Sequence, residues 1–462
     1  MSISGPTPGP TALRQLISSL PAGVVVDEPA TLENYRFDWS RDQGAGTPLA
    51  VVRPTDVDQV QTVLRWASAH QIPVVPRGAG SGLSGGSSAV DAGVVLSMER
   101  MRAIEIDTAT RVAVVEPGAF NAEVKAAAAA HGLWYPPDPS SYDICSIGGN
   151  IATNAGGLCC VKYGVTTDYV LGLDVVLADG TKITLGGKRI KDVAGLSLLK
   201  LFVGSEGTLG VITRAILRLI PAQPVRSTLV AAFPTVAAAA DAVVAIGATL
   251  RASMMELMDN ASINAVEDYR PMGLDRNAGA MLLAQSDAPG DARALEIDAM
   301  EAACELAGAK EVFVTDDPDE GELFVAARRA AFPAVEALGT LLLEDVGVPV
   351  PLLPELLAGI ANIATTHDTP VPVVAHAGDG NTHPLVVYDP ADEDARTRAY
   401  LAFDEIMALA ISLGGTITGE HGVGRAKKAA LPHQLGPEVM ALTRTIKNAL
   451  DPHNILNPGA IL

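Results

Sequence analysis

Hydrophobic and polar positions in the first half of the chain follow two different periods. Residues 56–70 carry apolar side chains at helical spacing behind Asp56, a residue type that caps helix N-termini, and they predict an amphipathic helix. Short runs rich in Val and Leu predict buried strands, and Asp179-Gly180 is typical of a β-hairpin turn. The predicted elements are the helix 56–70, the strands 72–76, 93–98 and 111–119, the helix 121–132 and the hairpin 169–185.

The pattern changes after Pro221 and Pro224, which flank a predicted linker. The elements predicted beyond it are the strand 228–233, the helix 235–250, the strands 253–258 and 279–285, the helix 291–307 and the strand 310–315. This alternation predicts helices packed on an antiparallel sheet, in a second domain of roughly 200 residues. The last stretch, 448–462, is too short to be a domain, so we expect it to pack back on the first one.

Composition and charge narrow the class of protein. At 462 residues and 48% hydrophobic content, the chain is long enough for two or three domains, each with its own core. Its formal net charge of −20 argues against nucleic acid or an anionic membrane surface as a partner. The four cysteines include no CxxC pair, so neither a disulfide framework nor an Fe–S cluster is expected.

Targeting signals are not evident in the sequence. Residues 1–16 lack a basic start followed by an apolar stretch, so we expect no secretion signal. No uncharged apolar run approaches the roughly 20 residues that a membrane helix needs. These features predict a reduced, cytoplasmic protein without a membrane span.

A glycine-rich loop over residues 77–86 carries the first candidate chemistry. Gly80 to Gly85 fit the pattern G-x-G-x-x-G, but the dinucleotide fingerprint must open a helix, and this loop leads into the β-branched run 94–96. Consecutive backbone N–H groups between two strands form an anion nest, and Arg77 stands at its edge. A plain flexible loop is the alternative. We interpret 146–157 and 204–210 as two further glycine loops, which together predict one large, phosphate-bearing ligand.

Residues 371–388 predict two strands joined by a turn centred on Asp379-Gly380. Counting outward from that centre pairs His376 with His383, which would place their Cβ atoms about 5 Å apart on one face. Glu420 and His421 lie between glycines farther along the chain. Two imidazoles and one carboxylate with open positions are typical of a catalytic divalent site, which suits Zn²⁺ and also Mn²⁺ or Fe²⁺. A histidine pair without the glutamate would favour a structural role.

Six motifs in one order carry a family resemblance. They are "PVVPRGAGSGLSGG", "IGGNIATNAGG", "GSEGTLGVIT", "HAGDGNTHP", "TGEHGVGR" and "NILNPG". Across about residues 45–462 the chain resembles the FAD-linked oxidases of the vanillyl-alcohol-oxidase/PCMH flavoprotein superfamily. Within that superfamily it most resembles the group of D-lactate dehydrogenase, the glycolate oxidase FAD subunit and D-2-hydroxyglutarate dehydrogenase.

The resemblance implies an α+β fold with a bipartite PCMH-type FAD-binding domain. An N-terminal segment, 1–44, would precede the FAD domain, 45–222. An α+β cap domain with an antiparallel sheet, 223–430, would hold the substrate and the metal, and the segment 431–462 would return to the FAD domain.

The resemblance also implies site residues. We see no sure attachment histidine, so FAD is expected to be non-covalent. The residues implied to bind FAD are Arg77, Gly78, Gly80, Gly82, Ser84, Gly85, Gly148, Gly149, Asn154, Gly157, Glu206, Gly207, Ile212 and Asn457. His376, His383 and Glu420 fall on the metal ligands of the family, and His421 falls on its proposed base.

The implied reaction is the oxidation of a small D-2-hydroxy monocarboxylic acid to the 2-oxo acid. The metal would lower the pKa of the substrate hydroxyl, His421 would take its proton, and the hydride would pass to flavin N5. By its place in the family motif, Arg328 would hold the substrate carboxylate. The neighbouring Arg329 has a solvated helix face as its alternative role.

One departure from the family pattern bears on the substrate. In members that oxidise five-carbon dicarboxylates, a lysine and an asparagine stand where this chain has Leu343 and Leu385. This favours D-lactate or glycolate, unless Lys427 or Lys428 supplies the missing cation. A D-2-hydroxyglutarate dehydrogenase, a flavin subunit of a multi-subunit glycolate oxidase and a flavin electron-transfer protein with a structural metal remain the alternatives.

The sequence leaves the partners of the reaction open. The electron acceptor could be a quinone, an electron-transfer protein or oxygen. A homodimer and a separate Fe–S subunit are both compatible with the chain.

Overall fold

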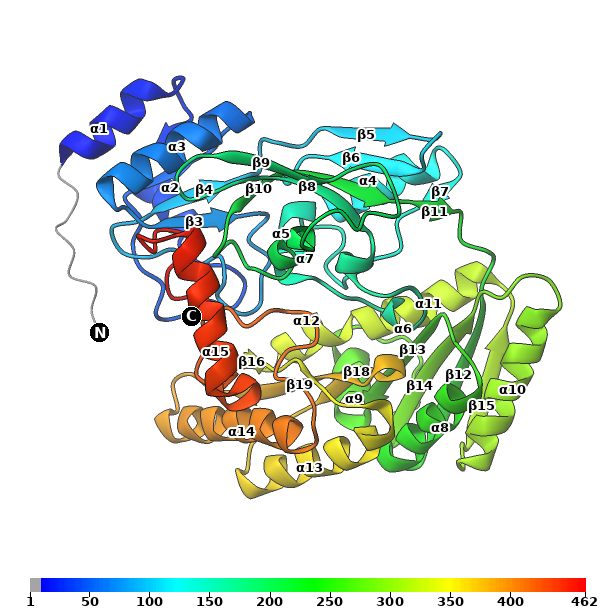
Figure 1. Cartoon of the computed structure of the whole chain (residues 1–462). Coiled ribbons are helices and arrows are strands. Elements are labelled where there is room, and N and C mark those ends of the chain that lie inside the picture. The colour runs from blue at the N-terminus through cyan, green and yellow to red at the C-terminus, as the bar shows by residue number, and fades with distance from the viewer. Residues whose placement is uncertain (1–9) are drawn as a thin grey trace. The chain divides into compact units, whose positions relative to one another are not determined.

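The computed structural model describes residues 10–462, and it divides into two units (Figure 1). The first unit comprises the chain up to Ala155 together with Val165–Ala222 and Glu420–Leu462. The second comprises Gly156–Gly164 and Gln223–Gly419. Residues 1–9, which include part of the stretch considered for a secretion signal, lie outside the described residues. No helix in the described part of the chain is long and apolar enough to cross a membrane.

The first unit contains a four-stranded sheet in the order β1-β2-β4-β3, a five-stranded sheet in the order β5-β6-β10-β8-β9, and the pair β11-β7. Its strands are β1 (Val25–Val26), β2 (Ala50–Val52), β3 (Val74–Arg77), β4 (Val94–Ser97), β5 (Ile104–Asp107), β6 (Val112–Val115), β7 (Leu133–Trp134), β8 (Val170–Val176), β9 (Lys182–Gly186), β10 (Val211–Arg218) and β11 (Ile220–Pro221). Its helices are α1 (Pro10–Ser19), α2 (Pro29–Asn34), α3 (Val57–His70), α4 (Asn121–Ala129), α5 (Ile147–Thr153), the short 3-10 helix η1 (Thr166–Asp168), α7 (Leu198–Phe202) and α15 (Leu431–Leu450).

Two predicted elements of this unit show how local sequence directs the fold. The helix expected behind Asp56 is confirmed as α3, because the Asp56 side chain accepts a hydrogen bond from the Gln59 amide and the apolar residues pack into the core. The hairpin β8–β9 is also confirmed. Its turn is closed by Asp179, which accepts from the Thr181 amide, and by Gly180 at φ +82°. Strands β3 and β4 are parallel, with the glycine-rich loop between them.

The segment 146–157 departs from the prediction, because we expected a glycine loop and the chain forms the helix α5. Asn154 ends this helix in the left-handed conformation, where its amide closes the last turn. Gly148 is a packing glycine, since a Cβ there would lie 2.6 Å from Pro117 Cβ. The glycines of this segment therefore include one that lets a helix approach its neighbour, which the sequence could not distinguish from a loop glycine.

The second unit is built on one eight-stranded sheet in the order β15-β12-β14-β13-β18-β19-β16, with β17 also paired to β19. Its strands are β12 (Ser227–Phe233), β13 (Met254–Asp259), β14 (Ala280–Ser286), β15 (Glu311–Thr315), β16 (Thr340–Leu343), β17 (Val346–Gly347), β18 (Val373–His376) and β19 (Asn381–Tyr388). Its helices are α6 (Cys160–Tyr163), α8 (Val236–Thr249), α9 (Asn260–Tyr269), α10 (Ala292–Leu306), α11 (Pro318–Arg329), α12 (Ala331–Glu336), α13 (Leu353–Thr366), α14 (Glu393–Ser412) and the 3-10 helices η2 (Val350–Leu352) and η3 (Ala377–Asp379).

The predicted antiparallel sheet with helices is confirmed, and it is wider than the sequence pattern indicated. Helices α9 and α12 pack on the sheet face that carries Met258 and Leu385, in one continuous apolar cluster. Helices α10, α8, α13 and α14 pack next to one another in that order and form a separate row (Figure 1). The face that carries Met258 also carries His376 and His383, because side chains two apart on a strand share a face.

Candidate active site

The hairpin β18–β19 brings two histidines together in a register that differs from the prediction. His376 pairs with Asn381 and His383 pairs with Val374, so the expected direct pair of His376 with His383 was wrong by two residues. The cause is the turn, in which η3 and a left-handed Gly380 occupy four positions instead of two. A shift of two residues keeps every side chain on its face. The two imidazoles are therefore diagonal neighbours, with ring centroids 4.9 Å apart.

A buried glutamate that the sequence analysis missed lies directly across the sheet from the first histidine. Glu256 on β13 is the register partner of His376. His376 Nδ1 lies 2.8 Å from Glu256 Oε1 and 2.9 Å from Oε2. When Nδ1 donates to this carboxylate, Nε2 carries the lone pair, which is the form of imidazole that binds metals. A lone carboxylate in the apolar strand "MMELM" was the signal that could have identified it.

The same glutamate is paired with the predicted anchor for the substrate carboxylate. Arg328, in the last turn of α11, places Nε 3.0 Å from Glu256 Oε2, and both side chains are buried. This contact is an ion pair that is not aligned as a hydrogen bond, and within residues 10–462 the buried Nη2 has no hydrogen-bond partner. Arg329 instead forms an ion pair with Glu322 at 3.1 Å. The described contacts therefore distinguish the two arginines, because only Arg328 is paired with the carboxylate that also contacts His376.

A second missed carboxylate accompanies the second histidine. Asp345 Oδ1 lies 3.7 Å from His383 Nδ1, and Asp345 is fully buried. Its Oδ2 accepts hydrogen bonds from the Thr418 hydroxyl at 2.6 Å and from the Gly419 amide at 3.0 Å. Asp345 thus holds the backbone immediately before Glu420. The acidic doublet "ED" after "LLL" was its signal in the sequence.

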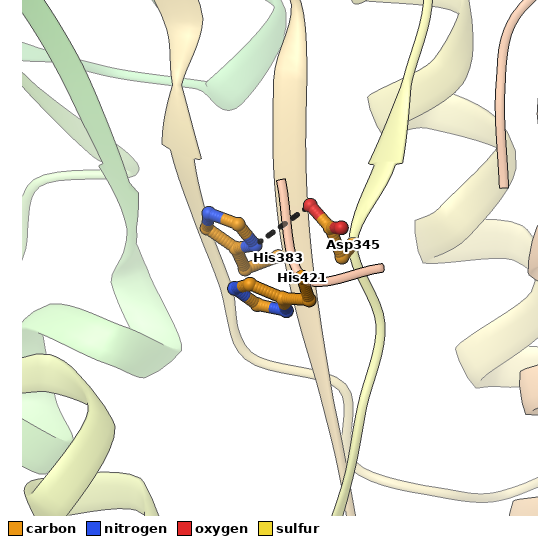
Figure 2. Close-up of side chains that lie close together, drawn as sticks. All are labelled: Asp345, His383 and His421. Carbon is orange, nitrogen blue, oxygen red and sulfur yellow. Dashed lines mark ion pairs between the residues drawn. The ribbon is translucent and has the colours of Figure 1, made fainter. Parts of the chain in front are cut away.

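Glu420 and His421 follow this held backbone directly. Both residues belong to the first unit, whereas His376, His383 and Asp345 belong to the second. Within the second unit the two imidazoles are neighbours, and Figure 2 shows Asp345 as the ion-pair partner of His383. Two neighbouring imidazoles suit a divalent cation, and one further carboxylate would complete the donor set of a catalytic site. Asp345 already accepts two hydrogen bonds, which favours a supporting role for this carboxylate.

The glycine-rich loop of the first unit offers a run of backbone donors. The Ala79 amide donates to Ser146 Oγ at 3.1 Å, and the Ser87 amide donates to Asp38 Oδ2 at 3.2 Å. Between these two positions, none of the amides of residues 80–86 donates a hydrogen bond to any residue of the described chain. Consecutive backbone donors without a protein acceptor fit the oxygens of a pyrophosphate. The loop therefore fits the phosphate part of FAD.

Protein packing accounts for some glycines of this loop. A Cβ at Gly78 would lie 2.2 Å from Ser146 Oγ, and one at Gly80 would lie 2.0 Å from Arg77 Nη2. Arg77 is buried against the loop, where its Nη1 donates to the Ser87 carbonyl, and burial lowers the pKa of its guanidinium. We expected this arginine at the loop's edge, and the structure places it in contact with the loop's glycines.

Glu206 connects the loop 204–210 to the segment that follows His421. Its carboxylate accepts from the amides of Val423 at 2.7 Å and Gly424 at 2.8 Å. Desolvation by burial is the main cause that raises the pKa of Glu206 to about 7. Ser84 of the glycine-rich loop also contacts the segment after His421, because its hydroxyl donates to the Gly422 carbonyl at 2.8 Å.

Asn457, in the C-terminal segment, contacts both the glycine-rich loop and Glu206. Its Nδ2 donates to the carbonyls of Gly86 and Glu206, each at 2.7 Å, and its own amide donates to Val74 in β3. Within residues 10–462, the buried Asn457 Oδ1 has no hydrogen-bond partner. This acceptor beside the amide-rich loop is a candidate partner for a donor on the cofactor.

The remaining residues implied to bind FAD occupy separate places. Gly149 lies in α5, and its added Cβ would meet only Ser146 Oγ at 3.3 Å. Asn154 Oδ1 accepts from the Thr167 amide at 2.8 Å. Ile212 is buried in β10, Gly85 and Gly207 have positive φ, and Gly82 has room for a Cβ, with its nearest neighbour at 3.4 Å. Gly157 belongs to the second unit and the others belong to the first.

Comparison with known proteins places the chain in a family. Residues 222–461 match the family model described as "FAD linked oxidases, C-terminal domain", and residues 48–186 match the model described as "FAD binding domain". The chain belongs to the FAD-linked oxidases. The resemblance stated from six motifs is thereby confirmed.

Among the relatives of this FAD-linked oxidase is the glycolate oxidase subunit GlcD of Bacillus subtilis (strain 168), 42% identical over 92% of this chain and 91% of the relative. The glycolate oxidase subunit GlcD of Escherichia coli (strain K12) is 40% identical over 89% of this chain and 83% of the relative. The D-lactate dehydrogenase of Archaeoglobus fulgidus is 36% identical over 93% of this chain and 95% of the relative.

Solved structures confirm the predicted fold class. p-Cresol methylhydroxylase with substrate bound has a TM-score of 0.80 at 18% identity, covering 97% of this chain and 96% of that one. The 4-ethylphenol oxidase of Gulosibacter chungangensis has a TM-score of 0.77 at 20% identity, covering 97% of this chain and 96% of that one. The FAD-linked oxidase therefore has the PCMH-type α+β architecture.

Proposed function

We propose that this FAD-linked oxidase oxidises small D-2-hydroxy monocarboxylic acids, of the D-lactate or glycolate type, to 2-oxo acids. The proposal includes non-covalent FAD and a divalent cation, with Zn²⁺ first and Mn²⁺ or Fe²⁺ as alternatives. The observation that carries it is the buried series Arg328–Glu256–His376, with His383 beside it. This series would put an anchor for one carboxylate next to two imidazoles that we propose as metal ligands. The names of the relatives, glycolate oxidase subunit and D-lactate dehydrogenase, support the same substrate class.

Arg328 has the chemistry to bind the substrate carboxylate. Its guanidinium is buried, and its Nη2 has no acceptor among the described residues. A carboxylate would satisfy that donor through a charge-assisted hydrogen bond. Arg328 would thereby orient the substrate with its hydroxyl toward the histidines.

The proton of the substrate hydroxyl needs an acceptor, and His421 is the proposed base. A cation held by His376, His383 and Glu420 would lower the pKa of the bound hydroxyl. His421 must be neutral to take the proton, so the reaction should slow at low pH as this imidazole becomes protonated. Bound FAD would accept the hydride, which no side chain can do.

The proposed size of the substrate rests on two leucines on the histidine face. Leu385 is two residues after His383 on β19, and Leu343 is its direct partner on β16. Both leucines belong to the apolar cluster under α9 and α12. A second substrate carboxylate buried against this pair would lose its hydration without a counter-charge, at a cost of several kcal/mol. This supports a monocarboxylate and disfavours D-2-hydroxyglutarate.

A second candidate function is the flavin subunit of a multi-subunit glycolate oxidase. The observation that favours it is the name of two relatives at 42% and 40% identity, each of which is a glycolate oxidase subunit. In that case electrons would leave through a partner protein. The site chemistry proposed here is the same in both cases, and only the electron acceptor differs.

Anaerobic mixing of the FAD-loaded protein with single acids tests the proposal. D-Lactate or glycolate should bleach the oxidised flavin absorbance, while L-lactate and D-2-hydroxyglutarate should do so far more slowly. Reduction by the dicarboxylate faster than by any monocarboxylate would show that another residue supplies the missing cation. If none of the four acids bleaches the flavin, the alternative of an electron-transfer protein with a structural metal gains support.

A further inference from the structure

We propose that Glu256 is a positioning residue that sets both halves of the site, the metal ligand His376 and the carboxylate anchor Arg328. The inference rests on the proposed function, which it deepens by assigning a role to a residue outside the motifs. Glu256 would act through its two neighbours and would not itself touch the substrate. All three residues belong to the second unit.

The position of Glu256 is dictated by the sheet. It lies near the middle of β13, with Leu283 of β14 as its register partner on one side and His376 of β18 on the other. Its side chain has no solvent exposure. A carboxylate in such a place needs partners to offset its lost hydration. The contacts given above with His376 Nδ1 and Arg328 Nε supply them.

The first consequence concerns the imidazole of His376. A carboxylate at Nδ1 fixes the ring's orientation and keeps the proton on Nδ1, so that Nε2 presents its lone pair. The cross-strand register keeps this carboxylate in place whether or not a cation is bound. His383 has an acidic neighbour of the same kind in Asp345, but at 3.7 Å instead of 2.8 Å. Glu256 is therefore the closer of the two supports.

The second consequence concerns the charge of Arg328. Without Glu256, the guanidinium would be a buried cation with no close counter-ion among its described contacts, a situation that is strongly unfavourable. With Glu256 at Nε, the arginine is held at one end of its guanidinium, and Nη2 remains for a ligand. The same carboxylate therefore holds the arginine and leaves a donor for the substrate.

A purely structural ion pair is the competing explanation, and it predicts different behaviour. A structural pair would affect stability but neither metal nor carboxylate binding. The chain offers a matched control in Glu267, a buried carboxylate of the same unit that accepts from the amides of Met272 at 2.8 Å and Leu274 at 2.9 Å. Glu267→Gln removes a buried charge of the same kind whose hydrogen bonds go to Met272 and Leu274 and to neither histidine.

The test compares Glu256→Gln, Glu256→Asp and Glu267→Gln with wild type, each loaded with FAD. Zinc affinity is measured by competition with a fluorescent chelator. Carboxylate binding is measured on metal-free protein by titrating pyruvate and following the flavin spectrum. Glu256→Gln should lose about 10–100-fold in zinc affinity, as removal of such a supporting group does at other sites. It should also weaken pyruvate binding and raise KM for D-lactate more than it lowers kcat, because Arg328 is misplaced.

The aspartate variant covers the case in which the glutamine variant does not fold. Its carboxylate keeps the charge but is one methylene shorter, so it should bind zinc with intermediate affinity. The inference is overturned if Glu256→Gln, or Glu256→Asp where Gln does not fold, binds zinc and pyruvate as wild type does. It is overturned equally if Glu267→Gln weakens both ligands to the same extent, or if wild type binds no zinc. If wild type binds zinc but oxidises none of the acids, the proposed function fails, and a Glu256-dependent zinc affinity still supports the positioning role.

Discussion

Replacing Glu206 with glutamine should remove a pH-dependent loss of stability from this protein. The carboxylate is buried and accepts the amides of Val423 and Gly424. Burial penalises its charged form more than these two donors favour it, and the pKa is raised to about 7. Glutamine has nearly the same shape and carries no charge at any pH, so it isolates the contribution of ionisation.

The magnitude follows from the difference between the folded and unfolded states. The pKa rises from 4.5 to about 7, and each unit is worth 1.36 kcal/mol, so the linked free energy is about 3 kcal/mol. Between these two pKa values the folded state binds more protons than the unfolded state. The free energy of unfolding therefore falls as pH rises through this window. The contribution is fully present below pH 4.5 and is lost above pH 7.

The assay is reversible denaturant unfolding of FAD-loaded wild type and Glu206→Gln at several pH values from 4.5 to 8. Glutamine can accept only one of the two amides, so the variant can be less stable at every pH. The informative quantity is the difference between the two proteins, in which all other titrating groups cancel. That difference should change by about 3 kcal/mol across the window, in favour of the variant at high pH. A difference that stays constant with pH would refute the assignment of a raised pKa to Glu206.

Two further predictions concern the metal and the flavin. His383→Ala and Glu420→Gln should each lose bound zinc but keep FAD, whereas His421→Ala should keep both and reduce its flavin about 10²–10⁴-fold more slowly, because a base contributes about that much. Metal analysis and stopped-flow absorbance measure these effects, and flavin reduction by His421→Ala at the wild-type rate would assign the base elsewhere. Gly82→Val should lower the FAD-to-protein ratio, since its Cβ meets no protein atom closer than 3.4 Å and the new side chain stands among the free amides. Gly247→Val, on the exposed side of α8, is the control, and equal FAD ratios in the two variants would contradict the phosphate role of the loop.

The sequence by itself determined the elements whose signals are local. Asp56 caps the helix α3, and Asp179-Gly180 closes the hairpin β8–β9. The alternation of strand and helix patterns after residue 224 predicted an antiparallel sheet with helices. The glycine-rich loop was separable from a Rossmann loop because the next element is a strand. The family motifs, rather than any periodicity, led to the proposals of Arg328 as the carboxylate anchor and His421 as the base. In all these cases the information lies within a few neighbouring residues or in a motif of fixed order.

Only the tertiary structure decided how distant segments meet. The register of β18 and β19 depended on the conformation of four turn residues, and it moved the histidine pair from opposite to diagonal positions. Glu256 and His376 are 120 residues apart in the chain, and they are in contact because β13 and β18 are neighbours in the sheet. The spacing of residues in the sequence does not show which strands become neighbours. Asp345 likewise meets His383 and Gly419 through strand order and backbone hydrogen bonding. Residue types that can bind a metal or an anion can be identified in a sequence. Which buried carboxylates contact those residues depends on the order and register of the strands.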